Sequence, residues 1–167
     1  VCCNYQHNDA FPGSHPLSVG PLGYNGSKAA MDLISKADVV LALGTRLNPF
    51  STLPGYGIDY WPNSAKLIQV DINADRIGLT KPVAVGIQGD AKKVAEILTA
   101  KITASGDKDR EDLIHQTKSS WLQTLSSMDH EDDDPGTTWN ERARGREPEK
   151  MSPRMAWRAI QQALPKE

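Results

Sequence analysis

A continuous apolar run, Val39 to Leu43, that ends abruptly at Gly44 is the feature of this sequence that most restricts its fold. Apolar residues without polar alternation predict a strand buried on both faces, as in a parallel sheet covered by helices. Ligands of such sheets bind just beyond the carboxyl ends of the strands, where a glycine lets the backbone come close. Gly44 and Arg46 occupy that position. The alternative interpretation is a tight turn followed by a surface arginine.

Other stretches alternate between strand and helix patterns. Lys66–Val70 and Val83–Ile87 are predicted to be strands, the second again buried, and Val1–Tyr5 is predicted to be the end of another. Helices are predicted from Ser27 to Lys36, through an apolar face of Ala30, Leu33, Ile34 and Ala37, and after Asp90, through Val94, Ile97, Leu98 and Ile102. This order predicts an α/β fold in which helices flank a parallel β-sheet, as in Rossmann-like domains.

Glycines and carboxylates lie where a nucleotide would bind in such a fold. Asp71 follows the second strand, where a carboxylate commonly accepts a ribose hydroxyl; capping a helical turn at 74–77 is the alternative role. Gly89 and Asp90 follow the third strand, and Asp90 is also expected to cap the next helix. The glycines at 20, 23 and 26 precede Ser27, an expected N-cap, and could expose backbone N–H groups to a phosphate, although a plain loop also uses glycines.

Composition excludes several classes of protein. A formal net charge of −2 over 167 residues argues against a general nucleic-acid binder. No apolar run approaches the roughly 20 residues that cross a bilayer, and the N-terminus does not resemble a signal peptide. Cys2 and Cys3 are adjacent and cannot join distant segments, so reduced thiols in a cytoplasmic protein are expected. These cysteines with His7 and His15 lack the paired spacing of a structural zinc site, so no metal is expected.

The chain is predicted to divide into four parts. Residues 1–104 form the α/β domain, expected to be truncated because it begins within a strand and lacks a first strand and helix. Residues 105–128 form an outer helix, and residues 129–151 a charged linker around Pro135-Gly136. Residues 152–167, which open with Ser152-Pro153, are expected to form the first helix of a further domain.

Several motifs, taken in order, resemble one enzyme family. They are Leu22-Gly23-x-x-Gly26-Ser27, Ala37-Asp38, Gly44-x-Arg46, Val70-Asp71-Ile72-Asn73 and Gly89-Asp90. The sequence resembles the central domain of thiamine-diphosphate enzymes related to acetohydroxyacid synthase. On this resemblance, the candidate cofactor-binding residues of the chain are Gly23, Tyr24, Asn25, Gly26, Gly44, Thr45, Arg46, Asp71, Ile72, Gly89 and Asp90.

Longer stretches, GPLGYNGSKAAM, GTRLNPF and YGIDYWP among them, resemble one branch of this family. Its members cleave a sulfonated aldehyde, release sulfite and transfer the acetyl group to phosphate. The resemblance therefore implies an acyltransferase of taurine breakdown. One alternative is the central domain of an acetolactate synthase that acts on pyruvate. The other is a stand-alone nucleotide-binding regulatory module.

Departures from the family pattern qualify these expectations. Tyr24-Asn25 replaces the Met-His that helps to hold FAD, so FAD is not expected and an adenine nucleotide is the more plausible ligand. Leu47-Asn48-Pro49-Phe50 replaces a set whose arginine helps to recognise a 2-keto acid. The motifs for thiamine diphosphate and Mg²⁺ lie in other domains of the family, so no catalytic residue is expected here. The expected partners are those domains of the same polypeptide, in a homo-oligomer.

Overall fold

The computed structural model describes residues 1–23, 26–103, 106–131 and 153–164. Contacts group residues 1–118 into one compact unit and residues 119–167 into another, and each unit is considered by itself. The predicted sheet lies in the first unit.

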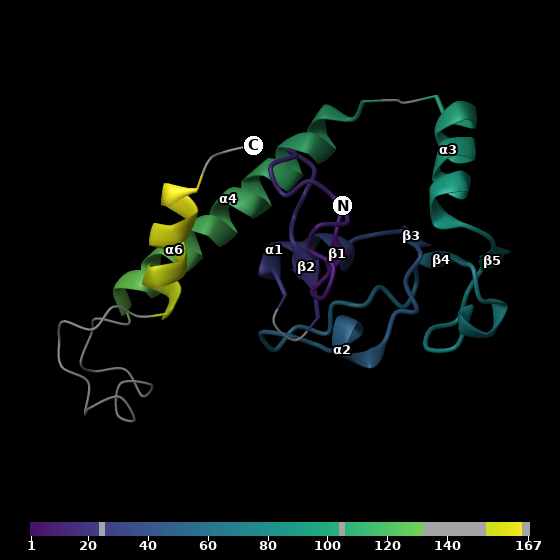
Figure 1. Ribbon diagram of the computed structural model, residues 1–167, viewed down its shortest axis with the longest axis horizontal. Coiled ribbons are helices and arrows are strands. Elements are labelled where there is room, and N and C mark those ends of the chain that lie inside the picture. Colours follow the sequence, from purple (N-terminus) through teal and green to yellow (C-terminus); the bar gives the residue numbers. More distant parts are fainter. Residues whose placement is uncertain (24–25, 104–105, 132–152, 165–167) are drawn as a thin grey trace. The chain divides into compact units, whose positions relative to one another are not determined.

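Three parallel strands form that sheet, in the order β3 (Val39–Leu43), β4 (Lys66–Asp71) and β5 (Val85–Gln88) (Figure 1). The register pairs Leu43 with Val70 and Val70 with Ile87, so the strands end at the same edge. A second, shorter parallel pair joins β1 (Cys3–Asn4) and β2 (Pro21–Leu22). The α/β fold with parallel strands is therefore confirmed, whereas no strand was predicted at the position of β2.

Helices occur where the apolar patterns predict them. The described helices are α1 (Lys28–Ile34), α2 (Pro49–Thr52), η1 (Ala74–Arg76), α3 (Ala91–Lys101), α4 (Lys108–Glu131) and α6 (Pro153–Ala163). Both predicted N-caps are present: the Ser27 hydroxyl accepts a hydrogen bond from the Ala30 N–H, and the Asp90 carboxylate accepts one from the Lys93 N–H.

The core of the first unit lies on one face of the sheet. Ala42 and Leu67 pack there with Leu47 and Trp61, which the connection between β3 and β4 supplies. Trp61 is nearly buried, and the ammonium of Lys81 lies 5.0 Å from its ring centroid. The connection after β3 therefore contributes side chains to the core, although Phe50 and Tyr56 within it are exposed.

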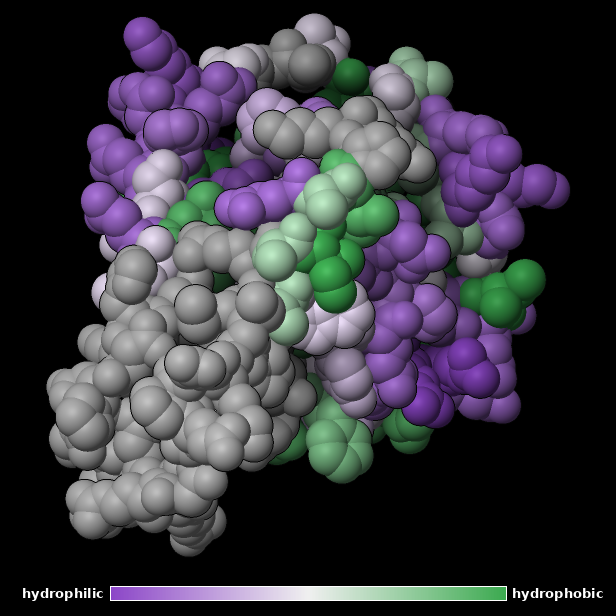
Figure 2. Space-filling view, turned by 60° about the vertical axis from the view of Figure 1, so that its left-hand side comes forward, coloured by the Kyte–Doolittle hydropathy of each residue, from purple (hydrophilic) through white to green (hydrophobic). Residues whose placement is uncertain are grey.

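The prediction that β3 is buried on both faces is wrong. Val39, Leu41 and Leu43 are exposed, although Ala42 on the opposite face is buried. The strand predicted at Val83–Ile87 begins at Val85, which is also exposed, so that strand is not fully buried either. The physical reason is that these exposed side chains all lie on the face of the sheet opposite the core of Ala42 and Leu67. Hydrophobic side chains also reach the surface on the side drawn in Figure 2.

The stretch predicted to be an outer helix contains α4, which continues to Glu131 and thus into the stretch expected to be linker; its place outside the domain stays a prediction. The rest of that stretch, residues 132–151, lies outside the described residues. The helix expected after Ser152 is α6, with Trp157 and Ile160 exposed on it and Leu164 exposed just after it. Among the described residues, no helix is both long and apolar enough to cross a bilayer.

Candidate functional site

The carboxyl ends of β3, β4 and β5 place several predicted site residues at one edge of the sheet. Gly44 continues β3 and donates its N–H to the Val70 carbonyl at 2.8 Å. Gly89 continues β5 and donates to the Asp71 carbonyl at 3.0 Å. The structure therefore brings Gly44, Asp71 and Gly89 together through their backbones, as parallel pairing requires.

Gly44 has a structural reason to be glycine. Its φ angle is +63°, and a Cβ added there would lie 3.4 Å from the Cβ of Ala91, the first residue of α3. The end of β3 thus lies against the N-terminus of α3. The backbone turns sharply at the point where a ligand was predicted to approach.

The two carboxylates at this edge are both engaged in local turns. Asp71 is buried, and its Oδ1 accepts a hydrogen bond from the Asn73 N–H at 2.9 Å. Asn73 in turn caps η1 by accepting from the Asp75 N–H at 2.9 Å. Asp90 caps α3 through the Lys93 N–H at 2.9 Å. Asp71 therefore supports the turn before η1, close to the alternative role given to it above.

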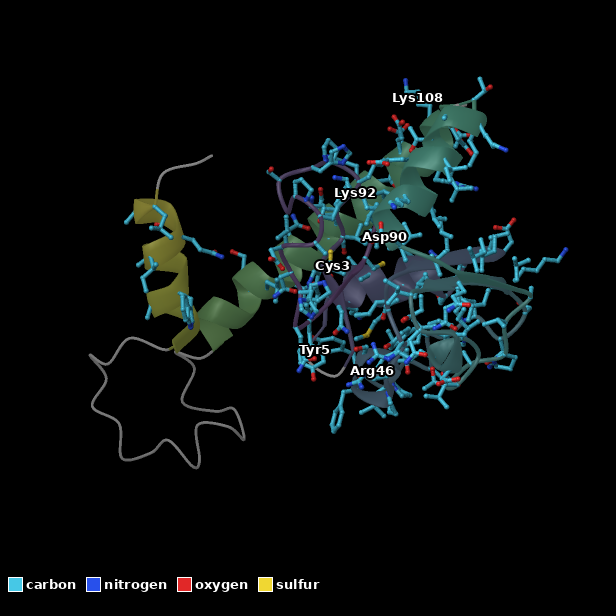
Figure 3. All side chains as sticks on the ribbon, turned by 45° about the vertical axis from the view of Figure 1, so that its right-hand side comes forward. Cys3, Tyr5, Arg46, Asp90, Lys92 and Lys108 are labelled. Carbon is cyan, nitrogen blue, oxygen red and sulfur yellow. The ribbon has the colours of Figure 1, made fainter. Side chains whose placement is uncertain are left out.

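Arg46 does not face Asp90. Figure 3 shows the two residues apart, whereas Asp90 and Lys92 lie together at the beginning of α3. Arg46 is exposed, and its carbonyl accepts a hydrogen bond from the Thr80 hydroxyl at 3.2 Å. Thr45 uses its Oγ1 to accept from the Leu47 N–H at 3.2 Å. Ile72, another predicted site residue, is exposed.

The residue that organises this edge is Gln69, which the sequence analysis did not single out. Its side chain is buried on the core face of β4. Its Nε2 donates to the carbonyls of Thr45 at 3.0 Å and Arg76 at 3.2 Å, and its Oε1 accepts from the Gly78 N–H at 2.9 Å. A polar residue between Ile68 and Val70 in an otherwise apolar strand was the available signal, because a buried amide needs partners.

The glycine segment before α1 packs against the connection that follows β3. Gly23 has a φ angle of +102°, and a Cβ added there would lie 2.3 Å from the Phe50 carbonyl oxygen. The Tyr56 hydroxyl donates to the Gly26 carbonyl at 3.2 Å. α1 has only seven residues, and Ser27 caps it. These glycines therefore permit close packing; Tyr24 and Asn25 lie outside the described residues.

Tyr60 fastens the same two segments together. Its hydroxyl donates to the Ser51 carbonyl at 3.3 Å and accepts from the Gly23 N–H. Burial raises the pKa of Tyr60 to about 12, although the Gly23 hydrogen bond acts in the opposite direction. Burial also raises the pKa of the nearby Cys2 thiol. Neither group is therefore prepared for proton transfer near neutral pH.

A cavity of about 290 Å³ lies at the opposite end of the sheet. Val40 and Leu67 line it at the amino ends of their strands, together with Trp61, Pro62, Pro82 and Val83. It is thus separate from the predicted nucleotide crevice.

The described residues do not fit a Mg²⁺-diphosphate site. They contain no group of three or more His, Cys, Asp or Glu side chains that could hold a metal ion. Mg²⁺ prefers several oxygen ligands, and the carboxylates of Asp71 and Asp90 at the sheet edge are not joined by a third such side chain among these residues.

The sequence of this chain matches the model of one known protein family. Residues 1–98 match the family model described as "Thiamine pyrophosphate enzyme, central domain". The chain belongs to this family. The match covers the sheet, the glycine segment and most of α3.

Individual proteins of this family differ in how similar they are to the chain. The chain is 77% identical to "Sulfoacetaldehyde acetyltransferase" of Roseovarius nubinhibens, over 100% of this chain and 28% of the relative. Its identity to the protein of the same name from Rhodobacter capsulatus is 70%, over 100% of this chain and 29% of the relative. "Probable acetolactate synthase large subunit" of Methanocaldococcus jannaschii is 33% identical, over 79% of this chain and 22% of the relative. The chain thus spans less than a third of the length of these curated relatives.

Proposed function

We propose that this chain is the central domain of a thiamine-diphosphate-dependent sulfoacetaldehyde acetyltransferase. The proposed reaction breaks the carbon–sulfur bond of sulfoacetaldehyde, releases sulfite and transfers the acetyl group to phosphate as acetyl phosphate. The observation that carries the proposal is the 77% identity over 100% of the chain, against 33% for an acetolactate synthase relative.

The stretch after β3 supports the choice between these two activities. Leu47 is buried in the core, Asn48 caps α2 by accepting from the Ser51 N–H at 3.0 Å, and Pro49 is the first residue of that helix. The four residues that replace the keto-acid set thus form a capped helical turn without an arginine. These four positions therefore provide no counterpart of the pyruvate-recognising arginine that the resemblance implies for acetolactate synthases.

We assign the domain a supporting role. Gly23 takes part in close packing, Asp71 supports a turn and Asp90 caps a helix, and the described residues do not fit Mg²⁺ and diphosphate. Thiamine diphosphate and Mg²⁺ would therefore bind to other domains of the same polypeptide, within a cytoplasmic homo-oligomer. An adenine nucleotide is not included in the proposed function, because the comparisons give it no support. A stand-alone nucleotide-binding module is likewise not supported over an enzyme domain.

The test uses the full-length protein with thiamine diphosphate and Mg²⁺, offered sulfoacetaldehyde with phosphate in one reaction and pyruvate in another. We expect acetyl phosphate from the first reaction and little acetolactate from the second. Acetolactate as the main product, with no acetyl phosphate, would favour the acetolactate synthase alternative.

A further inference from the structure

The cavity at the amino ends of the strands has walls that belong to the protein core. Val40, Leu67 and Trp61 line it, and all three pack in the core on the face of the sheet that carries Ala42. Leu67 and Trp61 are buried. Because the packing of the core holds these side chains in place, the cavity is formed before any ligand arrives, as is usual for small-molecule sites.

This cavity is distinct from the edge of the sheet where a nucleotide was predicted to bind. Val40 lies near the start of β3, and Lys66 and Leu67 are the first residues of β4. Gly44 and Asp71 lie at the other ends of the same strands. At about 3.3 Å per residue, the two edges are roughly 15 Å apart. A ligand in the cavity therefore would not occupy the carboxyl edge.

The charge beside the cavity is positive. Lys66 lines it, and the ammonium of Lys81 lies 5.0 Å from the ring centroid of Trp61, another lining residue. None of the described residues that line the cavity is an aspartate or a glutamate. Within the part of the chain that the structure describes, neither lysine is paired with a carboxylate. Two ammonium groups are thus present beside an apolar wall, and their charge would complement that of an anion.

The volume of the cavity restricts the size of a ligand. About 290 Å³ is at the low end of the range for small-molecule sites, which runs from roughly 300 to 1,000 Å³. A single ring with one charged group fits this volume, whereas a dinucleotide does not.

We propose that the cavity binds a small organic anion with an apolar ring, of the aromatic carboxylate class. The ring would lie against Val40, Leu67 and Trp61, and the carboxylate would lie near Lys66 and Lys81. This site goes beyond the proposed function, because it involves neither the acyl transfer nor the cofactor.

Two simpler ligands match the cavity less well. An inorganic anion such as phosphate would meet the two lysines but would leave the apolar wall in contact with water. A neutral ring would cover that wall but would leave both ammonium groups without an opposite charge. Only a ligand with both features uses both parts of the site.

The test is saturation-transfer NMR with benzoate as the probe and benzamide as its uncharged counterpart. It is carried out on the full-length protein and on the 167-residue chain. Ala84→Phe, at an exposed alanine that lines the cavity, places a ring in it, and Ala65→Phe serves if that variant does not fold. Lys66→Gln and Lys81→Gln each remove one charge. Lys92→Gln, at an exposed lysine of α3 outside the cavity lining, is the matched control.

We expect benzoate to bind with a dissociation constant in the millimolar range. The dissociation constant should rise about threefold to fivefold in Lys66→Gln and in Lys81→Gln, and by a similar factor for benzamide. Binding should be lost in Ala84→Phe and unchanged in Lys92→Gln.

No binding of benzoate, or equal binding in Ala84→Phe, would overturn the proposal. Equal affinity for benzoate and benzamide, or unchanged affinity in both lysine variants, would overturn the assignment of an anion. Binding to the 167-residue chain that is absent from the full-length protein would also overturn the proposal, because other parts of the polypeptide would then fill the cavity. Benzoate binding requires no catalysis, so the result is independent of which acyl transfer the enzyme performs.

Discussion

The Nε2 of Gln69 donates a hydrogen bond to the carbonyl oxygen of Thr45 at 3.0 Å. This contact joins β4 to the turn that follows β3. The same side chain also bonds to Arg76 and Gly78, so one buried amide holds two loops at the carboxyl edge of the sheet. The loops at the carboxyl edge of the sheet are therefore held by Gln69, whose side-chain amide is used in hydrogen bonds within the protein.

Replacing Gln69 should test this role. Gln69→Leu leaves two carbonyls and one N–H without their partner, so we expect the free energy of unfolding to fall by about 2–4 kcal/mol. Urea denaturation of the 167-residue chain measures this free energy of unfolding. The control is Gln88→Leu on exposed β5, whose Nε2 is 3.5 Å from the Ile72 carbonyl. The free energy of unfolding of Gln88→Leu should differ from that of the unaltered chain by no more than about 0.5 kcal/mol. Equal losses in both variants would contradict the assignment.

The glycine segment offers a comparison between steric contact and backbone conformation. Gly23→Ala combines a φ of +102° with a Cβ 2.3 Å from the Phe50 carbonyl, whereas Gly57→Ala has a φ of +71° and no atom within 4 Å. We expect Gly23→Ala to cost about 3 kcal/mol or more of unfolding free energy and Gly57→Ala about 1 kcal/mol. Thermal or urea unfolding measures both. The close-packing account fails if Gly23→Ala is the milder change.

Tyr60 should make stability depend on alkaline pH. Its pKa is raised from 10.0 to about 12 in the folded protein, so the unfolded chain ionises first as pH rises. The stabilisation is complete below pH 10.0 and is lost as pH approaches about 12. Tyr60→Phe should lose about 1 kcal/mol at neutral pH and weaken this decline. The free energy of unfolding, measured for both proteins across alkaline pH, checks this prediction. The same pH profile in Tyr60→Phe as in the unaltered chain would argue that Tyr60 does not cause the decline.

The isolated chain should not bind thiamine diphosphate with Mg²⁺. The prediction follows from the described residues, which contain no group of three or more His, Cys, Asp or Glu side chains that could hold a metal ion, and from the family resemblance, which implies that the cofactor motifs lie in other domains. Calorimetric titration of the 167-residue chain should give no one-to-one micromolar isotherm. The full-length protein, titrated in parallel, should bind. Tight binding by the isolated chain would show that the cofactor residues had been misplaced.

Short sequence patterns predicted most of the helices and strands, but they did not predict which other segments pack against each of them. The bounds of β3 and the caps Ser27 and Asp90 followed from apolar runs and short-range hydrogen-bonding chemistry, and the structure confirms them. The exposure of Leu41 did not follow, because an apolar run does not reveal whether a neighbouring element covers it. Gln69 and Tyr60 were missed for a similar reason: their partners lie in other segments, and only the folded chain brings them together.

The most direct test of the central claim is sulfite release by the full-length protein. With sulfoacetaldehyde, thiamine diphosphate and Mg²⁺ present, sulfite should appear together with an equal amount of acetyl phosphate, and acetyl phosphate should disappear when phosphate is omitted. The account of this chain as the central domain of a sulfoacetaldehyde acetyltransferase would be contradicted if pure, folded and cofactor-loaded protein released no sulfite.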